Sequence, residues 1–324
     1  MEGCDDFRKW DELIPDALGL IFKNLSLLEI LTVVPRVCKA WGKAVNGPYC
    51  WQEIDIEEWS KECKPDIIDR MLQLLITKSC GSLRRLAVYG LSSEQSFVFI
   101  ANHAQSLRAL RLPRSEITDP IMARASRTLS SLTSLDLSYC IRVGARGLEA
   151  VGRACRSLTS LRRVMHPLEV VGKPFQDDEA LAVGGTMPRL RQLEIAYLLV
   201  RTHSVVEIIK NCKELELLDV RGCWDVNLEE GFVKGFKGLR VVGPVVVDCY
   251  DVFSELSGSS GYLAWDFVAG ESLDVDDDWY DEHGGMMGSD DDDDDDGSSV
   301  EDVEMWFYDD VDAVDSGFDW PQSP

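Results

Sequence analysis

The chain has 324 residues, enough for about two domains, and its 45% hydrophobic content is that of an ordinary folded protein. The sequence has no run of eighteen apolar residues and no basic, apolar leader, so we expect neither a membrane-spanning helix nor a signal peptide. The ten cysteines include no Cys-x-x-Cys pair, which favours ordinary intracellular thiols over disulfides or a metal site.

The net charge of −24 is distributed very unevenly along the chain. Residues 250–324 hold 25 Asp and Glu and no Lys or Arg, whereas the first 249 residues hold 32 acids and 33 bases. A block of like charges repels itself and seldom folds alone. We therefore predict a nearly neutral folded part, preceded by an extension over residues 1–9, and a separate, disordered acidic tail over residues 250–324.

Residues 10–51 predict three short helices. The first begins at Pro15, because the N–H that proline lacks is not needed at the first helical position. A second helix over residues 27–34 is expected to stop at Pro35, and a third covers residues 37–46. Three such helices cannot bury so many large apolar side chains among themselves. The apolar side chains that remain unburied predict either a contact with the next domain or a surface for a partner.

The apolar residues of this segment occur in a dense, ordered series: Leu13, Ile14, Pro15, Ile21, Phe22, Leu25, Leu31, Val34, Val37, Cys38, Trp41 and Trp51. This order and spacing resemble an F-box, the module by which substrate receptors dock on a Skp-type adaptor in cullin–RING ubiquitin ligases. Ile14 stands where Leu usually precedes the proline, and Gly19 inside the first helix costs about 1 kcal/mol relative to Ala. The resemblance implies that twelve residues bind the adaptor: Leu13, Ile14, Pro15, Leu18, Ile21, Phe22, Leu25, Leu31, Val34, Val37, Cys38 and Trp41.

Beyond the F-box, which we assign to residues 10–56, Ile54 and Ile56 predict an irregular first strand, and a helix over residues 66–79 would join the two parts. A leucine-based pattern then recurs with spacings of 24, 25, 26, 32, 25 and 24 residues. Its first leucines are Leu83, Leu107, Leu132, Leu158, Leu190, Leu215 and Leu239. This period predicts an α/β leucine-rich-repeat solenoid of about seven units over residues 57–249, with a parallel sheet inside and helices outside.

Cysteines occupy equivalent places in several units, after strands or at the ends of helices: Cys80, Cys140, Cys155, Cys212 and Cys223. Together with an Ile-Thr-Asp segment at residues 117–119, they resemble the cysteine-containing class of these repeats, and we interpret them as small buried core residues. An F-box followed at once by such repeats resembles the plant F-box/leucine-rich-repeat substrate receptors, over residues 10 to about 247.

Residues that flank the inward-pointing leucines of each strand face the concave side of the solenoid. Aromatic and arginine side chains commonly anchor protein interfaces. We therefore predict a substrate-binding set on this face: Tyr89, Arg111, Tyr139, Arg162, Tyr197, Arg221 and Trp224. The alternative is a solvated face whose charges only keep the solenoid soluble. The long spacing between Leu158 and Leu190 adds an insertion that either lines the face or is neutral padding.

The four histidines are far apart, and no nucleophile motif or phosphate-binding loop accompanies them. We therefore expect no catalytic residue, no metal and no cofactor, and the protein itself is not expected to be an enzyme. The seven-aspartate run at residues 290–296 lacks the spacing of a calcium loop. Repulsion, solubility and attraction of a basic partner are the open alternatives for the tail.

The resemblance implies the substrate-recognition subunit of an SCF-type ubiquitin ligase. Its partners would be a Skp/ASK-type adaptor, a cullin and a RING subunit reached through that adaptor, and an unidentified substrate protein that is ubiquitinated and degraded by the proteasome. We expect neither membrane nor direct nucleic-acid binding, and we expect the nucleus, the cytoplasm or both as the compartment. The alternative is a non-ligase, acid-tailed leucine-rich-repeat binding protein, chaperone-like or acting on a GTPase, which would lack an F-box.

Overall fold

The computed structural model describes residues 10, 13–165 and 174–244, and the predicted N-terminal extension and acidic tail lie outside them. Within this part of the chain, one sheet of eight parallel strands follows the sequence order from β1 to β8. The strands are β1 (Glu53–Asp55), β2 (Arg85–Ala87), β3 (Ala109–Arg111), β4 (Ser134–Asp136), β5 (Ser160–Arg162), β6 (Gln192–Glu194), β7 (Leu217–Asp219) and β8 (Arg240–Val242).

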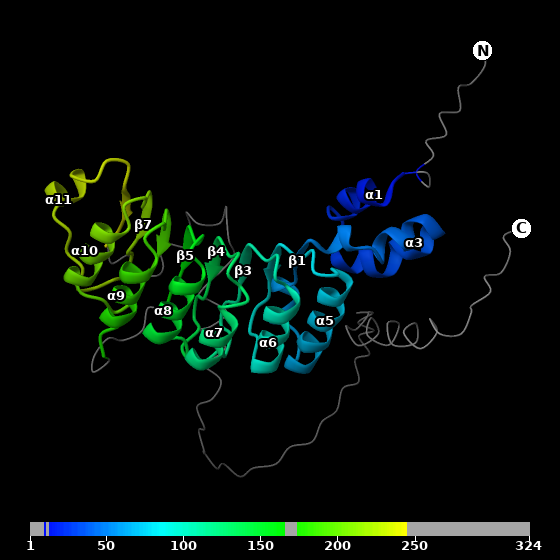
Figure 1. Ribbon diagram of the computed structural model, residues 1–324, viewed down its shortest axis with the longest axis horizontal. Coiled ribbons are helices and arrows are strands. Elements are labelled where there is room, and N and C mark those ends of the chain that lie inside the picture. Colours follow the sequence, from blue (N-terminus) through cyan, green and yellow to red (C-terminus); the bar gives the residue numbers. More distant parts are fainter. Residues whose placement is uncertain (1–9, 11–12, 166–173, 245–324) are drawn as a thin grey trace, which may run out of the picture. The chain divides into compact units, whose positions relative to one another are not determined.

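A helix follows each of the first seven strands, and the helices between residues 65 and 211 lie along one side of the sheet, each packed against the next (Figure 1). These helices are α4 (Glu57–Lys61) with α5 (Pro65–Lys78), α6 (Glu94–His103), α7 (Asp119–Ala125), α8 (Ala145–Ala154), α9 (Asp177–Thr186), α10 (Thr202–Asn211) and α11 (Glu230–Lys234). The opposite side of the sheet, termed the open face below, is the face that the sequence analysis called concave. The strand–helix repetition confirms the leucine-rich-repeat prediction.

A buried leucine at the centre of each strand from β2 to β7 holds the repeats together. Leu86, Leu110, Leu135, Leu161 and Leu193 stand in register on adjacent strands, and none is more than 1% exposed. A single repeat could not bury such a side chain, because its neighbours on both sides supply the cover. The stacked leucines therefore form a core that runs through the solenoid.

Replacement of Leu135 by alanine is expected to lower the free energy of unfolding by about 2–5 kcal/mol, because the side chain is 1% exposed and a cavity would open between β3 and β5. Ser134→Ala, one residue earlier on the half-buried open face, is expected to change it by less than about 0.5 kcal/mol. Chemical denaturation of both variants tests this pair. Equal midpoints would contradict the assignment of Leu135 to the inward side of the strand and of Ser134 to the open face.

Aspartates at the starts of α7 and α9 link their repeats to the next one. Asp119 Oδ1 accepts hydrogen bonds from the backbone N–H groups of Gly144 at 2.7 Å and Gly147 at 3.0 Å, where α8 begins. Asp177 Oδ1 accepts from the N–H of Arg201 at 2.8 Å in the same way, ahead of α10. Both carboxylates satisfy donors that a helix start leaves free, so the Ile-Thr-Asp segment has a structural role between repeats.

Four of the five repeat cysteines are buried, as predicted: Cys140, Cys155, Cys212 and Cys223. Each thiol donates to a backbone carbonyl of the preceding repeat, as Cys140 Sγ does to Leu112 at 3.0 Å, and burial raises the pKa of Cys140 to about 11. The prediction is wrong for Cys80, which is exposed. The turn after α5 has one residue more, so Ser79, 0% exposed, takes the interior place.

The F-box segment folds into α1 (Pro15–Phe22), a π-helical turn η2 (Glu29–Val33), α2 (Val34–Val37), α3 (Lys39–Val45) and the 3₁₀ turn η3 (Pro48–Trp51). The predicted stop at Pro35 is wrong, because η2 continues directly into α2 and the helix ends only where Cys38 is extended. Proline in an α-helix lacks one donor and clashes with the carbonyl four residues earlier. The wider π turn that precedes Pro35 accommodates the ring.

The predicted joint between F-box and solenoid is confirmed in its main features. Ile54, 3% exposed, lies on β1, so the sheet begins ahead of the boundary that we drew after residue 56. Helix α5 buries its apolar side, and its residue Lys78 donates to Asn46 Oδ1 at 2.9 Å. Ser82 Oγ donates to the carbonyl of Pro48 at 3.1 Å. Side chains on both sides of the joint therefore fix the end of the F-box to the first repeat.

Candidate adaptor-binding and substrate-binding surfaces

Four of the twelve predicted adaptor-binding residues form the interior of the F-box. Leu18, Phe22, Leu31 and Val34 are each at most 7% exposed. The Phe22 ring lies 5.0 Å from the ring of Trp41, which is half-buried. These side chains hold the module together and cannot contact a partner unless the module opens.

Five other residues of the set are exposed, namely Ile14, Pro15, Ile21, Leu25 and Val37. Ile14 is 66% exposed and Val37 54%, which is unusual for side chains of this size. Leu13, Cys38 and Trp41 are half-buried. The exposed members and the half-buried ones at their border are thus the part of the predicted set that a partner can reach.

The π turn adds exposed apolar residues that the sequence analysis missed. Leu28 is 53% exposed and Val33 56% exposed. In a π turn residues five apart lie on the same side, and in an α-helix residues four apart do. Leu28, Val33 and Val37 therefore form one apolar stripe along η2 and α2. Regular α-helical spacing places Leu28 and Val33 on different sides, so this stripe could not be recognised before the π turn was known.

A capping box starts this same helix. The Ser26 backbone N–H donates to Glu29 Oε2 at 2.9 Å, and the Glu29 N–H donates to Ser26 Oγ at 3.2 Å. Hydrogen bonds from Ser26 lower the pKa of the Glu29 carboxyl. The Ser-x-x-Glu spacing was visible in the sequence and fixes where the second helix begins.

Gly19 in α1 is explained by packing. A Cβ at this position would lie 2.7 Å from the Cβ of Tyr49 on η3. The glycine therefore allows α1 and η3 to approach closely, and its cost in helix propensity is offset by that contact.

Gly19→Ala is expected to destabilise the protein by about 1–3 kcal/mol, because overpacking outweighs the better helix propensity of alanine. The control is Gly185→Ala on α9, where a Cβ would meet nothing within 4 Å, and a gain of up to about 1 kcal/mol is expected. Thermal unfolding of both variants checks the opposite signs, and a gain at Gly19 would contradict the packing account.

A row of charged side chains crosses the open face. The sheet register places five of them directly beside one another on successive strands: Arg111, Asp136, Arg162, Glu194 and Asp219. Because neighbouring strands are about 4.8 Å apart, side chains in one row can reach each other. The row is therefore an electrostatic unit.

Most of this charge is compensated within the row and its surroundings. Arg111 lies 3.3 Å from Glu57 Oε2 and 3.7 Å from Asp136 Oδ2. Arg162 lies 3.0 Å from Glu194. Arg221 pairs with Asp219 at 2.6 Å. The three arginines predicted to bind substrate are thus held in place by carboxylates, and a substrate would meet preorganised guanidinium groups.

The three predicted tyrosines border this row, and two of them have unusual backbone conformations. Tyr139 and Tyr197 both have a φ of 60°, in the left-handed region that bulky residues rarely adopt. Their N–H groups donate to Val164 at 2.9 Å and to Arg221 at 2.7 Å in the next repeat. Strain of this kind persists only where the surroundings impose it and is frequent at functional sites.

Tyr89 and Trp224 complete the predicted substrate set. The Tyr89 hydroxyl accepts a hydrogen bond from Arg114 at 3.1 Å, and the ring lies 5.9 Å from Lys61 Nζ. Trp224 is 41% exposed, whereas the other six residues of the set are half-buried. The structure therefore places the set along the open face and its edge, and the assignment to substrate binding stays a prediction.

Glu57 lies at the end of the charged row nearest to the F-box. It is 5% exposed, and burial raises its pKa to about 7. Arg111 and Lys61 oppose this rise in pKa, whereas the nearby Asp55 and Asp136 add to it. The carboxyl is therefore more easily protonated in the folded protein than in the unfolded chain.

Because its folded pKa is raised, Glu57 contributes stability that is complete below its unfolded pKa, near 4.5, and that is lost as the pH rises through about 7. Glu57→Gln lacks this contribution, so its melting temperature should rise relative to wild type between pH 5 and pH 8. Thermal unfolding across that range measures the difference, and a constant difference would contradict the raised pKa.

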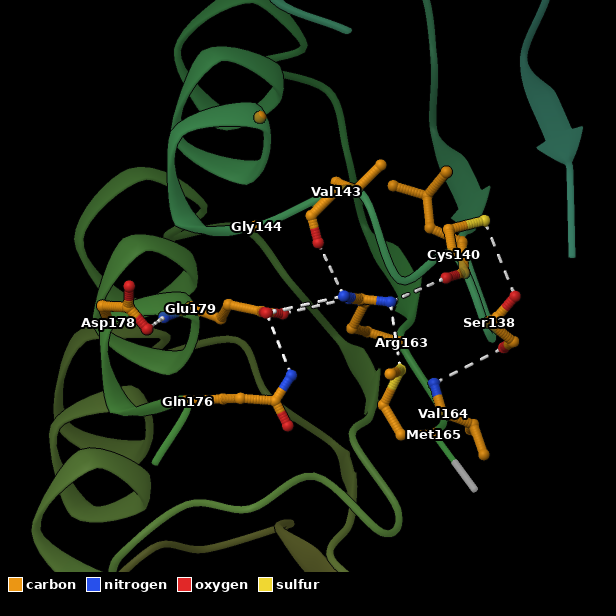
Figure 2. Close-up of polar contacts among 12 residues, drawn as sticks. Ser138, Cys140, Val143, Gly144, Arg163, Val164, Met165, Gln176, Asp178 and Glu179 are labelled. Atoms are coloured by element: carbon orange, nitrogen blue, oxygen red, sulfur yellow. Dashed lines mark hydrogen bonds and ion pairs between the residues drawn. The ribbon is translucent and has the colours of Figure 1, made fainter. Parts of the chain in front are cut away.

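A buried ion pair that the sequence analysis did not predict lies at the base of the insertion (Figure 2). Arg163 is 1% exposed, and its Nε lies 3.0 Å from Glu179 Oε2 on α9. Arg163 also donates to the carbonyls of Leu137 at 3.2 Å and Val143 at 2.7 Å. Gln176 donates to Glu179 at 3.0 Å. The pair ties both ends of the insertion to the core, although residues 166–173 lie outside the described part.

Across residues 10, 13–165 and 174–244, no group of three or more His, Cys, Asp or Glu side chains is arranged to hold a metal ion. In the same residues, no helix has the length and apolar content needed to cross a membrane.

A helical module with exposed apolar side chains, joined by side-chain contacts to a leucine-rich-repeat solenoid, defines the architectural class of this chain. The sequence is 52% identical over 277 residues to the F-box protein FBW2 of Arabidopsis thaliana, covering 82% of this chain and 87% of that protein. It is 30% identical to the F-box protein SKIP19 of the same plant, covering 83% and 87%.

A third Arabidopsis thaliana relative, F-box/LRR-repeat protein 23, is 30% identical over 224 residues, which cover 68% of this chain and 49% of that protein. No family model matches the sequence. The chain belongs to the F-box/leucine-rich-repeat proteins. In general, members of this family are non-catalytic substrate receptors of SCF-type ubiquitin ligases and bind Skp-type adaptors.

Proposed function

We propose that this protein is the substrate-recognition subunit of an SCF-type ubiquitin ligase. Its F-box binds a Skp/ASK-type adaptor, which connects it to a cullin and a RING subunit. The open face of the solenoid binds a substrate protein, which is ubiquitinated and then degraded by the proteasome. The rate gain comes from holding the substrate near the charged ubiquitin carrier, so the chain itself supplies no catalytic group.

Exposed apolar side chains on the small F-box carry this proposal. Ile14, Leu28, Val33 and Val37 are all more than half exposed. Several large apolar side chains left exposed on so small a module favour a partner that covers them. The alternative, a non-ligase acid-tailed leucine-rich-repeat binding protein, would lack an F-box and leaves these exposed side chains unexplained.

The open face supports the substrate part of the proposal. Its arginines are held by carboxylates, and two of its three tyrosines, Tyr139 and Tyr197, adopt a strained conformation next to them. Preorganised aromatic and guanidinium groups lose little conformational entropy on binding and are typical anchors of interfaces. The predicted substrate set thus combines the two kinds of side chain that a protein ligand needs.

Co-expression of the full chain with a plant Skp-type adaptor and a cullin tests the proposal. We expect the three proteins to elute together in gel filtration at equal stoichiometry. Elution of this chain apart from the adaptor would overturn the ligase assignment and favour the alternative without a ligase.

A further inference from the structure

Five exposed arginines mark the edge of the solenoid where the strands begin. Five consecutive helix-to-strand connections each contribute one of them: Arg84, Arg108, Arg127, Arg156 and Arg189. We term this set the basic rim. It is separate from the charged row on the open face and from the F-box, and neither surface described above includes any of its members.

Backbone hydrogen bonds show that the connections of the basic rim are neighbours in space. The N–H of Arg108 donates to the carbonyl of Arg84 at 2.8 Å, and the N–H of Thr133 donates to that of Arg108 at the same distance. Thr159 and Arg191 continue this ladder at 2.8 Å each. With strands about 4.8 Å apart, five connections span roughly 20 Å.

The positive charge of the rim is not compensated locally. Within the described residues, none of its five arginines makes an ion pair, whereas nearby Arg85 and Arg191 lie 3.7 Å from Glu53 and 3.5 Å from Glu214. Bases in the last turn of a helix, such as Arg153 on α8, are explained by the helix dipole. The rim arginines lie beyond the helix ends, so attraction to the helix dipole does not explain why arginines occur at most of these positions.

The opposite edge of the solenoid, where the strands end, carries charges of both signs. Acidic side chains begin α6, α7 and α9: Glu94, Asp119, Asp177, Asp178 and Glu179. Arginines on the same edge pair with acids there, as Arg142 does with Glu116 at 3.5 Å and Arg201 with Asp177 at 3.3 Å. The basic rim, whose arginines make no ion pair within the described residues, therefore attracts an extended acidic ligand more strongly than this mixed edge does.

We propose that the basic rim binds an extended acidic segment of the substrate protein, which makes proteins with a run of Asp and Glu the substrate class. The inference rests on the proposed function and adds a second contact beside the open face. Guanidinium groups bind carboxylates in pairs of parallel hydrogen bonds. An extended segment rises about 3.3 Å per residue, so roughly six residues match the length of the rim.

A nucleic acid is the less suitable polyanion. Single strands are bound by stacking bases on aromatic side chains between basic groups. In the described connections that carry the five rim arginines, no aromatic residue is present. The carboxylate chemistry of a protein segment therefore fits the rim better.

The test measures binding of a fluorescein-labelled peptide of twelve glutamates to the full chain by fluorescence anisotropy. Arg127→Glu with Arg156→Glu is expected to weaken binding about tenfold or more. The matched control, Arg142→Glu with Arg146→Glu, makes the same change in net charge between these two positions in the sequence but on the opposite edge, and should change affinity by less than about threefold. Because salt screens the attraction between charges, binding by the wild type should weaken steeply as the salt concentration rises from about 50 to about 200 mM.

Three outcomes would overturn the proposal. The first is an equal loss in the rim and control variants. The second is binding that is seen only after deletion of residues 271–324, which would assign the rim to acids of this chain. The third is tighter binding of a single-stranded oligonucleotide of equal charge. Both variants should still elute with the adaptor, so failure here is distinguishable from failure of the proposed function.

Discussion

A variant with Ile14→Asp and Val37→Asp is expected to lose the adaptor completely in co-purification while its solenoid stays folded. The two side chains are 66% and 54% exposed, so aspartate at either site disturbs no core packing. At a bound interface, large apolar anchors are worth about 2 kcal/mol or more each. Two buried aspartates would therefore weaken binding by about a thousandfold or more.

The matched control for this variant is Ile141→Asp. Ile141 is 78% exposed and lies in the solenoid after β4, away from the F-box. The same change from a large apolar side chain to aspartate should leave adaptor binding at the wild-type level. If the double variant still elutes with the adaptor at wild-type yield, or the control loses it as well, the exposed F-box residues are not the docking surface.

Trp41 is a poorer probe of the same interface, although the family resemblance includes it. Its ring packs 5.0 Å from the buried Phe22, and its Nε1 donates to the carbonyl of Trp10 at 3.3 Å. Trp41→Ala would therefore remove part of the F-box core and lose binding through misfolding. To distinguish loss of the fold from loss of the contact with the adaptor, a variant must change exposed residues such as Ile14. The sequence pattern alone does not distinguish Ile14 from the buried Phe22.

Which residues of each strand point into the core was predictable, because it depends on a repeated local pattern. Each Leu-x-x-Leu unit places its second leucine in the sheet, and Leu86, Leu110 and Leu135 confirm this in register. The failures come from single-residue departures. Cys80 lies as far before the first leucine of its repeat as the other helix-end cysteines do. The turn after α5 is one residue longer, however, so the preceding residue takes the place in the core and Cys80 is exposed. Pro35 has the usual helix-stopping signal, but the π turn before it absorbs the ring.

Contacts between repeats were not predictable in the same way. Arg111 meets Glu57 and Asp136 because the sheet register brings three separate segments together. A sequence shows which residues alternate along one strand, but it does not show which rotamer reaches across to the next strand. The buried and exposed members of the adaptor set could therefore be separated only from the fold, and the assignment of both sets to binding stays a prediction.

Arg163 is the strongest example of a residue that the pattern obscured. It occupies the inward position that is apolar in neighbouring repeats, where Leu137 and Ile195 are each at most 1% exposed. An arginine in that column was a visible anomaly, and the acidic start of α9 was its available partner. The fold resolves the anomaly by pairing Arg163 with Glu179 inside the core (Figure 2).

Removal of one partner of this pair is expected to be among the most damaging single changes to the solenoid. Glu179→Ala leaves the guanidinium of Arg163, 1% exposed, without its carboxylate. An uncompensated buried charge costs about 3–5 kcal/mol. Replacement of both residues by leucine should restore most of that loss or even stabilise the fold, because leucine suits this column and no charge remains buried. Urea denaturation of the matched single variants Arg163→Leu and Glu179→Leu and of the double variant measures the coupling. The pair is instead a peripheral contact if the double variant is as unstable as the sum of the two single losses.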